Sequence, residues 1–191
     1  MDERELFILS NRDLLPVIQR IRDEHWGLKA PPNITWKPDQ SIRDLVNYHI
    51  YDDAWVPDVL AGKTAEEVGD RYEHLRTTME TAAEYPRWNR VAIDAVSGFS
   101  AMERIVHLSY GDYTAREYLT HVSLFRGLRN YDLATFLGFA HSLSPELAQG
   151  LYEIVLPRAA LLREMHVIGA EIPVPSDAPL LKKFLALTGR G

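Results

Sequence analysis

The sequence has 191 residues, of which 46% are hydrophobic and 25% charged, with a formal net charge of −6 and no cysteine. These values are ordinary for a globular domain large enough to bury a substantial core. The negative charge argues against a nucleic-acid or anionic-membrane surface, because both need clustered positive charge. The lack of cysteine excludes disulfides and thiolate ligands from the protein itself and fits a reducing cytoplasm.

The chain shows no signal of export or membrane insertion. Its first ten residues, MDERELFILS, are acidic and lack the basic start of a signal peptide. No apolar stretch approaches the roughly 20 residues that a membrane span needs. We therefore expect a cytoplasmic protein, a monomer or homodimer, that folds as one domain over residues 1–191, with a tail from about 168 to 191 packing on it.

The N-terminal part of the chain predicts a helix followed by a loop. Apolar residues recur at helical spacing from about Ser10 to Trp26, with Ser10 or Asn11 as the N-cap. The prolines of residues 30–40 predict a loop.

Three further helical segments are predicted before residue 100. Ser41 opens a helix that runs to about Gly62, and Asp44 completes its capping box. The charge-rich segment Thr64–Glu84 predicts a third helical region, and Arg87–Gly98 continues as a helix after a proline.

A strand and the longest helix follow. The alternating segment Arg104–Ser109 predicts a strand that ends at a turn over Gly111–Asp112. Thr114 then opens a long helix that includes the stretch Glu117–Phe139. This helix has an apolar face with two arginines beside it: Phe125, Leu128, Asp132 and Phe136, with Arg126 and Arg129.

The C-terminal part predicts a helix from Ser144 to about Met165, an extended proline-containing segment and a short helix over Leu180–Leu187. Long helices therefore dominate, with little strand. The fold class that follows is all-α, a helical bundle with minor strand and short-helix elements.

Three blocks of the sequence carry a family resemblance. They are SIRDLVNYHIYDDAWVPDVLAGKTAEEVGDR, then RIVHLSYGDYTAREYL with the following LRNYDLA, and finally VIGAEIPVPSDAPLLKKFLALTGR. In order and spacing, the chain resembles the mycothiol-dependent maleylpyruvate isomerase-like branch of the DinB/YfiT four-helix-bundle superfamily. The resemblance implies a DinB-like four-helix bundle.

The resemblance also implies a bound divalent metal, but the ligand positions differ here. Members typically use a His on the second helix and two ligands, four residues apart, on the long third helix. In this sequence these positions fall on Tyr48, Phe125 and Arg129. Phenylalanine has no lone pair to give, and a guanidinium stays protonated. We therefore expect a metal-free member with no required cofactor, although mycothiol remains an alternative.

Four residues are candidates for catalysis. Arg129 takes the place of a metal ligand and either holds an anionic group or pairs with acids such as Asp132 or Asp53. Tyr48 is a candidate acid or hydrogen-bond donor, and His49 or Asp53 a candidate base. Helical spacing puts Tyr48 on one face with Asp52 and His49 on one face with Asp53, so at most one of Tyr48 and His49 is expected to point into the site.

A second group of residues is expected to bind the substrate. Aromatic side chains at these positions are either bundle core or the walls of a pocket for a planar molecule. The group consists of Arg126, Trp55, Tyr51, Phe125, His121 and Asp132.

The function expected from these features is a metal-independent enzyme acting on a small molecule. It would carry out an isomerase, cyclase or lyase type of acid–base step on an anionic or carbonyl-bearing substrate, with secondary metabolism as a natural setting. The alternatives are a mycothiol-dependent thiol transferase or isomerase and a non-catalytic small-molecule-binding pseudoenzyme. No nucleic-acid or membrane partner is expected.

Overall fold

The computed structural model describes residues 1–34 and 37–191, and it is mostly helical. Its contacts group the chain into two compact units, Asp2–Ser142 and Leu143–Gly191. The all-α class predicted from the sequence is confirmed, while the prediction of one domain over the whole chain stays a prediction.

The first unit begins with the long helix α1, Glu3–Gln19, and the one-turn helix α2, Asp23–Trp26. The predicted start of the first helix was wrong. Asp2 and Glu5 form a capping box, and α1 therefore begins seven residues before Ser10. Ser10 and Asn11 are buried inside α1.

A short 3₁₀ helix, η1 (Pro32–Ile34), lies within the predicted loop, of which residues 35–36 fall outside the described part of the chain. Helix α3 follows over Ile42–Leu60. Its N-cap is Ser41, whose side chain accepts a hydrogen bond from the backbone N–H of Asp44, as the capping box predicted.

The predicted third helical region is broken into pieces. Helix α4 covers only Ala65–Val68 and ends at Gly69, which has a φ of 62° that favours glycine. A 3₁₀ helix, η2 (Glu73–Thr77), and the long helix α5 (Thr81–Ser97) follow. The prediction of a continuous helical region missed the end of α4 at Gly69.

A β-hairpin precedes the longest helix. Strands β1, Ile105–Leu108, and β2, Gly111–Thr114, pair antiparallel, so the second strand occupies the predicted turn. Helix α6 then runs over Ala115–Leu137, capped by Thr114 as predicted.

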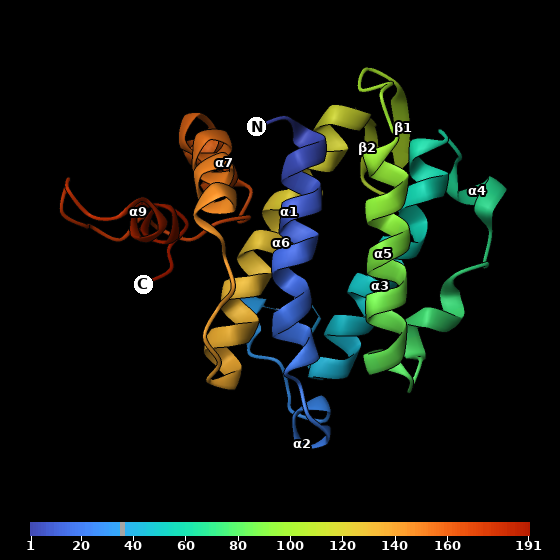
Figure 1. Ribbon diagram of the computed structural model, residues 1–191, viewed down its shortest axis with the longest axis horizontal. Coiled ribbons are helices and arrows are strands. Elements are labelled where there is room, and N and C mark those ends of the chain that lie inside the picture. Colours follow the sequence, from blue (N-terminus) through green and yellow to red (C-terminus); the bar gives the residue numbers. More distant parts are fainter. Residues whose placement is uncertain (35–36) are drawn as a thin grey trace. The chain divides into compact units, whose positions relative to one another are not determined.

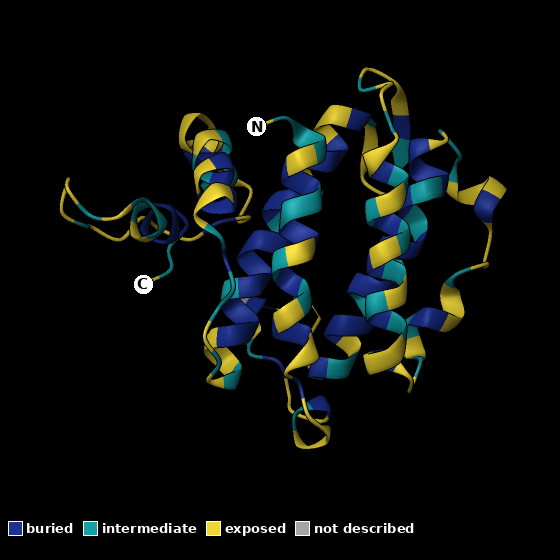
Figure 2. Cartoon of the chain, in the orientation of Figure 1, coloured by how far each residue is buried: buried dark blue, intermediate teal, exposed yellow. Residues whose placement is uncertain are grey.

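Helices α1, α3, α5 and α6 run alongside one another, with the hairpin at one end and α2 at the other (Figure 1). Helix α1 packs against α5 and α6, and α3 packs against α5. Buried residues face inward from these helices, and exposed residues cover their outer sides (Figure 2). On α6, Leu128 is buried as predicted, but Phe136 is 39% exposed and does not belong to the core.

The second unit contains α7, Pro145–Val155, and α9, Leu180–Leu187, which pack against each other. The predicted helix from Ser144 to Met165 is interrupted by the 3₁₀ turn η3, Leu156–Arg158, before α8, Ala159–Glu164. Pro157 accounts for this interruption, because proline has no backbone N–H to donate to the α-helical hydrogen-bond pattern.

Candidate functional site

A pocket of about 370 Å³ lies in the first unit, between α3, α6 and the hairpin. This volume is within the range of small-molecule sites. Its wall is largely aromatic and contains a single carboxylic acid among the described residues: Tyr48, Tyr51, Asp52, Trp55, Val59, Ala65, His107, Leu108, Ser109, Tyr110, Tyr118, His121, Val122 and Phe125.

Helical spacing explains how α3 builds its side of the wall. Tyr48, Asp52, Trp55 and Val59 follow one another at intervals of three or four residues and therefore share one face. Three of these positions are aromatic or acidic rather than aliphatic. The core-facing side of α3 is thus separate from the side that it presents to the pocket.

Helix α6 and the hairpin supply the other walls. Tyr118, His121 and Phe125 follow one another at intervals of three or four residues on α6. The hairpin turn contributes Tyr110, whose ring lies 6.1 Å from that of His121. The pocket therefore depends on the hairpin, which no pattern on the helices alone predicts.

Asp52 is the acidic group of the pocket. Its side chain makes no hydrogen bond or ion pair within the described residues, although it is only partly exposed. Burial raises the pKa of Asp52 to about 7, and the nearby Asp53 carboxylate adds to this effect, against the opposing charges of Arg126 and Arg76. A carboxyl group with this pKa exchanges protons near neutral pH.

The phenols around Asp52 stay protonated. The charge of Asp52, followed by burial, raises the pKa of Tyr48 to about 12. Burial and the charge of Asp52 raise the pKa of Tyr110 to about 12 and also raise that of Tyr118. These hydroxyl groups are therefore hydrogen-bond donors at neutral pH.

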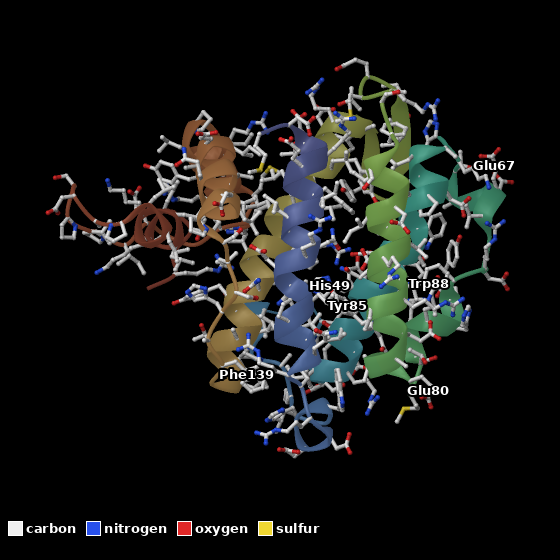
Figure 3. All side chains as sticks on the ribbon, viewed as in Figure 1. His49, Glu67, Glu80, Tyr85, Trp88 and Phe139 are labelled. Carbon is white, nitrogen blue, oxygen red and sulfur yellow. The ribbon has the colours of Figure 1, made fainter. Side chains whose placement is uncertain are left out.

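Behind the pocket wall lies a fully buried ion pair between α6 and α3. Arg126 Nη2 donates to Asp53 Oδ1 at 2.6 Å, and both side chains have no exposed area. Arg126 Nη1 lies 3.2 Å from His49 Nδ1, which can accept a hydrogen bond from it. Figure 3 shows His49 in the interior between the long helices.

One side-chain atom each of His49, Asp53 and Arg126 has no hydrogen-bond partner within the described residues. They are His49 Nε2, Asp53 Oδ2 and Arg126 Nε. Burial, together with the charges of Arg126 and Arg129, lowers the pKa of His49 well below its usual range, so His49 is neutral. Burial raises the pKa of Asp53 to about 6 against the effect of Arg126.

Phe125 lies between the pocket and His49, the histidine next to this ion pair. It lines the pocket, and its ring centroid lies 5.0 Å from that of His49. Tyr48 and His49, although adjacent, thus lie on different sides: Tyr48 on the pocket wall and His49 in the interior. This agrees with the expectation that only one of them would point into a shared site.

The remaining predicted residues fall into two places. Tyr51, Trp55, His121 and Phe125 line the pocket with Tyr48, whereas Arg126, Arg129, His49, Asp53 and Asp132 do not belong to its described lining. Arg129 instead donates to the backbone carbonyl of Ile34, and its guanidinium lies 5.0 Å from the centroid of the Phe125 ring. Asp132 is buried on α6.

Asp52, Tyr110 and Tyr118 were not among the residues predicted for the site. The spacing of Tyr48 and Asp52 was a usable signal, because it put Asp52 on the same helix face as a candidate donor. Tyr110 carried no such signal, since its place depends on the pairing of β1 with β2.

The donor set does not fit the metal that the family resemblance implies. Of the three expected ligand positions, Phe125 offers a ring and Arg129 a guanidinium that is already hydrogen-bonded to a carbonyl group. Within residues 1–34 and 37–191, no group of three His, Asp or Glu side chains is placed to hold a metal ion.

Comparisons with protein-family models, with curated proteins and with solved structures found no match. In the described part of the chain, no helix is both long enough and apolar enough to cross a membrane.

Proposed function

We propose that this chain is a metal-independent enzyme that moves a proton within a small carbonyl compound, as an isomerase or a related lyase or cyclase does. The observation that carries the proposal is the Asp52 carboxyl group, which lies on the wall of an aromatic pocket and has no hydrogen-bond or ion-pair partner within residues 1–34 and 37–191. Asp52 is partly exposed, so water can solvate it, and a molecule that displaces this water must supply its own hydrogen bond to the carboxyl group.

Asp52 acts as the acid–base group. A general base works best when its pKa lies near the working pH, and Asp52, at about 7, meets this condition. We assign to Asp52 the role of base that the sequence suggested for His49 or Asp53, because Asp52 lines the pocket and the other two do not.

Tyr118 and Tyr48 supply the hydrogen bonds to the reacting oxygen. Asp52 takes a proton from the carbon next to the carbonyl group, and the C–H electrons form the double bond of an enolate. A protonated phenol donates to the enolate oxygen. Asp52 then returns the proton to another carbon of the conjugated system, so the product is an isomer and no co-reactant is needed.

The scaffold that we infer is a DinB-like four-helix bundle. The packing of α1 with α5 and α6, and of α3 with α5, supports it. Arg126 on α6 contacts Asp53 and His49 on α3, and this contact between α6 and α3 would complete the four sides of such a bundle. The proposed catalytic chemistry needs only the pocket and does not depend on this assignment.

Proton exchange with solvent tests the proposal. A panel of conjugated ketones with enolisable C–H groups, 2-acetylnaphthalene among them, is incubated with the protein in D₂O and followed by proton NMR. Loss of the signal next to the carbonyl group should be faster than in buffer. Asp52→Asn should slow the enzymatic part by about 10²-fold or more, and Tyr118→Phe by a similar factor.

Asp70→Asn is the matched control, because Asp70 is exposed in a turn outside the pocket. It should exchange as the wild type does. If no ketone of the panel exchanges above the buffer rate, or if Asp52→Asn exchanges as fast as the wild type, the proposed proton transfer is refuted.

A further inference from the structure

The pocket combines many aromatic side chains with one acid and no strong base. Six tyrosine, tryptophan and phenylalanine side chains line it and suit a flat molecule: Tyr48, Tyr51, Trp55, Tyr110, Tyr118 and Phe125. Among the described lining residues Asp52 is the only carboxylic acid, the only basic groups are His107 and His121, and none is Lys or Arg.

The arginines near the pocket are engaged elsewhere. Arg126 is paired with Asp53, and Arg129 donates to the carbonyl group of Ile34. Arg76 lies within 3.5 Å of Glu73 and 4.8 Å from the centre of the Tyr51 ring. No guanidinium group is therefore placed on the described wall to receive a carboxylate or phosphate.

We propose that the pocket selects flat, uncharged carbonyl compounds and rejects their carboxylate analogues, with Asp52 as the residue that sets this selectivity. This substrate class rests on the proposed proton-transfer function. Of the anionic or carbonyl-bearing substrates expected from the sequence, it keeps the carbonyl-bearing ones and leaves out the anionic ones. A carboxylate ligand would meet a like charge in a partly desolvated site, where repulsion is weakly screened.

The electrostatic surroundings of Asp52 come from every element packed around it. On α3 they are Tyr48, Tyr51 and Asp53, and on α6 they are Arg126, Tyr118 and His121; η2 contributes Arg76, and the hairpin contributes His107 and Tyr110. The tyrosines stay neutral, and Asp53 and Arg126 compensate each other. Asp52 is thus the carboxyl group of the wall whose charge changes near neutral pH.

Two probes of matched size test the selectivity: 2-acetylnaphthalene, which is neutral, and 2-naphthoate, which is an anion. Binding of each to the full chain is measured by isothermal titration calorimetry at pH 8. The ketone should bind at least about tenfold more tightly than the carboxylate. Asp52→Asn, which removes the charge at nearly constant volume, should bring the two affinities together by strengthening the binding of 2-naphthoate.

The pH dependence gives an independent readout. If 2-naphthoate binds only when Asp52 is protonated, the competent fraction rises from about one in eleven at pH 8 to about ten in eleven at pH 6, for a pKa of about 7. Its affinity should then rise about tenfold, while that of 2-acetylnaphthalene changes little. In Asp52→Asn this rise should disappear.

A control is needed for His107 and His121, because they are the basic side chains among the described lining residues. The double variant His107→Gln, His121→Gln should keep the tenfold rise for 2-naphthoate. Circular dichroism of each variant establishes that it is folded. If Asp52→Asn loses its helical signal, Asp52→Ser takes its place, and the same results are expected for it.

The selectivity proposal is overturned if wild type binds 2-naphthoate as tightly as the ketone at pH 8. It is equally overturned if Asp52→Asn leaves the ratio of the two affinities unchanged. Its failure is distinguishable from that of the catalytic proposal. Charge-selective binding without solvent exchange refutes only the enzyme function, and exchange without charge selectivity refutes only the substrate class.

Discussion

Arg126 and Asp53 carry opposite charges in a part of the protein that water does not reach. Moving either charge from water into the interior costs several kcal/mol, and the contact of 2.6 Å between them offsets this cost only while both are present. The pair is therefore a requirement of the folded state rather than a large net source of stability.

Removing one member of the pair tests this interpretation. Arg126→Met should lower the free energy of unfolding by about 3–5 kcal/mol, because the buried Asp53 loses its counter-charge and must either stay charged or take up a proton. The double variant Arg126→Met, Asp53→Leu should be more stable than Arg126→Met alone. Urea unfolding followed by tryptophan fluorescence measures both changes, since all four tryptophans lie between residues 26 and 88.

An exposed ion pair provides the comparison. Arg87 lies 3.3 Å from Glu84 and is 65% exposed, so Arg87→Met should cost less than about 1 kcal/mol. Equal losses for Arg87→Met and Arg126→Met would contradict the role given to burial.

Asp52 makes the stability of the protein depend on pH. Its pKa is about 7 in the folded chain and about 3.9 in an unfolded one, so between these values the folded state binds more protons. The stability associated with Asp52 is thus complete below about pH 4 and is lost as pH rises through 7. Asp52→Asn removes this loss, and its stability relative to the wild type should grow by on the order of 1 kcal/mol or more between pH 5 and pH 8.

Urea unfolding at the two pH values measures this difference, with Asp70→Asn as the control that should track the wild type. A stability gap that stays constant with pH would contradict the raised pKa. A gain in stability together with a loss of proton exchange would show that Asp52 is kept for function.

At the residue scale, helical spacing predicted which side chains share a face. It separated Tyr48 with Asp52 from His49 with Asp53, and the structure keeps both pairs. The face of α3 that lines the pocket is determined by its packing against Phe125 and the hairpin. Local sequence patterns do not predict this packing. For the same reason Arg129, rather than Arg126, was taken as the central arginine.

At the scale of single elements, the end of α6 depends on a glycine. Gly138 adopts a left-handed conformation with φ of 70°, which a side chain disfavours. Gly138→Ala should therefore cost about 1–2 kcal/mol in the free energy of unfolding, although no atom within 4 Å would clash with the added Cβ.

Gly98, at the end of α5, is the matched control. It also has no atom within 4 Å of an added Cβ, but its φ is −93°. Gly98→Ala should leave stability unchanged or raise it slightly, because alanine restricts the unfolded chain. Similar losses at both positions would rule out backbone conformation as the cause.

Helix starts were predictable where a capping box follows a break in the chain, as at Ser41 and Thr114. The start of α1 was missed because Ser10 and Asn11 resemble caps, yet inside the helix their side chains donate to the backbone carbonyl of Phe7. The breaks around α4 and η2 were missed because a charged, helix-favouring composition hides the turn at Gly69.

At the scale of the whole molecule, the pocket and the buried ion pair both belong to the unit Asp2–Ser142. A chain that ends after Ser142 should therefore retain a cooperative unfolding transition in tryptophan fluorescence. It should also bind 2-acetylnaphthalene within about threefold of the full chain. The isolated segment Leu143–Gly191 is near the lower size limit for independent folding and should show no cooperative transition.

Circular dichroism and calorimetry of the two pieces test this division. If the shorter chain is unfolded, or if it binds the ketone only after the second piece is added, the two units are not independent in stability.

The ring of Phe125 keeps two polar systems of opposite character apart, an acid that faces the pocket and a guanidinium that faces the interior. A single smaller side chain at this position would uncover His49 and the guanidinium of Arg129, which the Phe125 ring contacts. A molecule in the pocket would then meet a positive charge as well as Asp52. The ligand charge that this scaffold accepts is thus held by one aromatic partition, and a short mutational path leads from a site that repels anions to one that receives them.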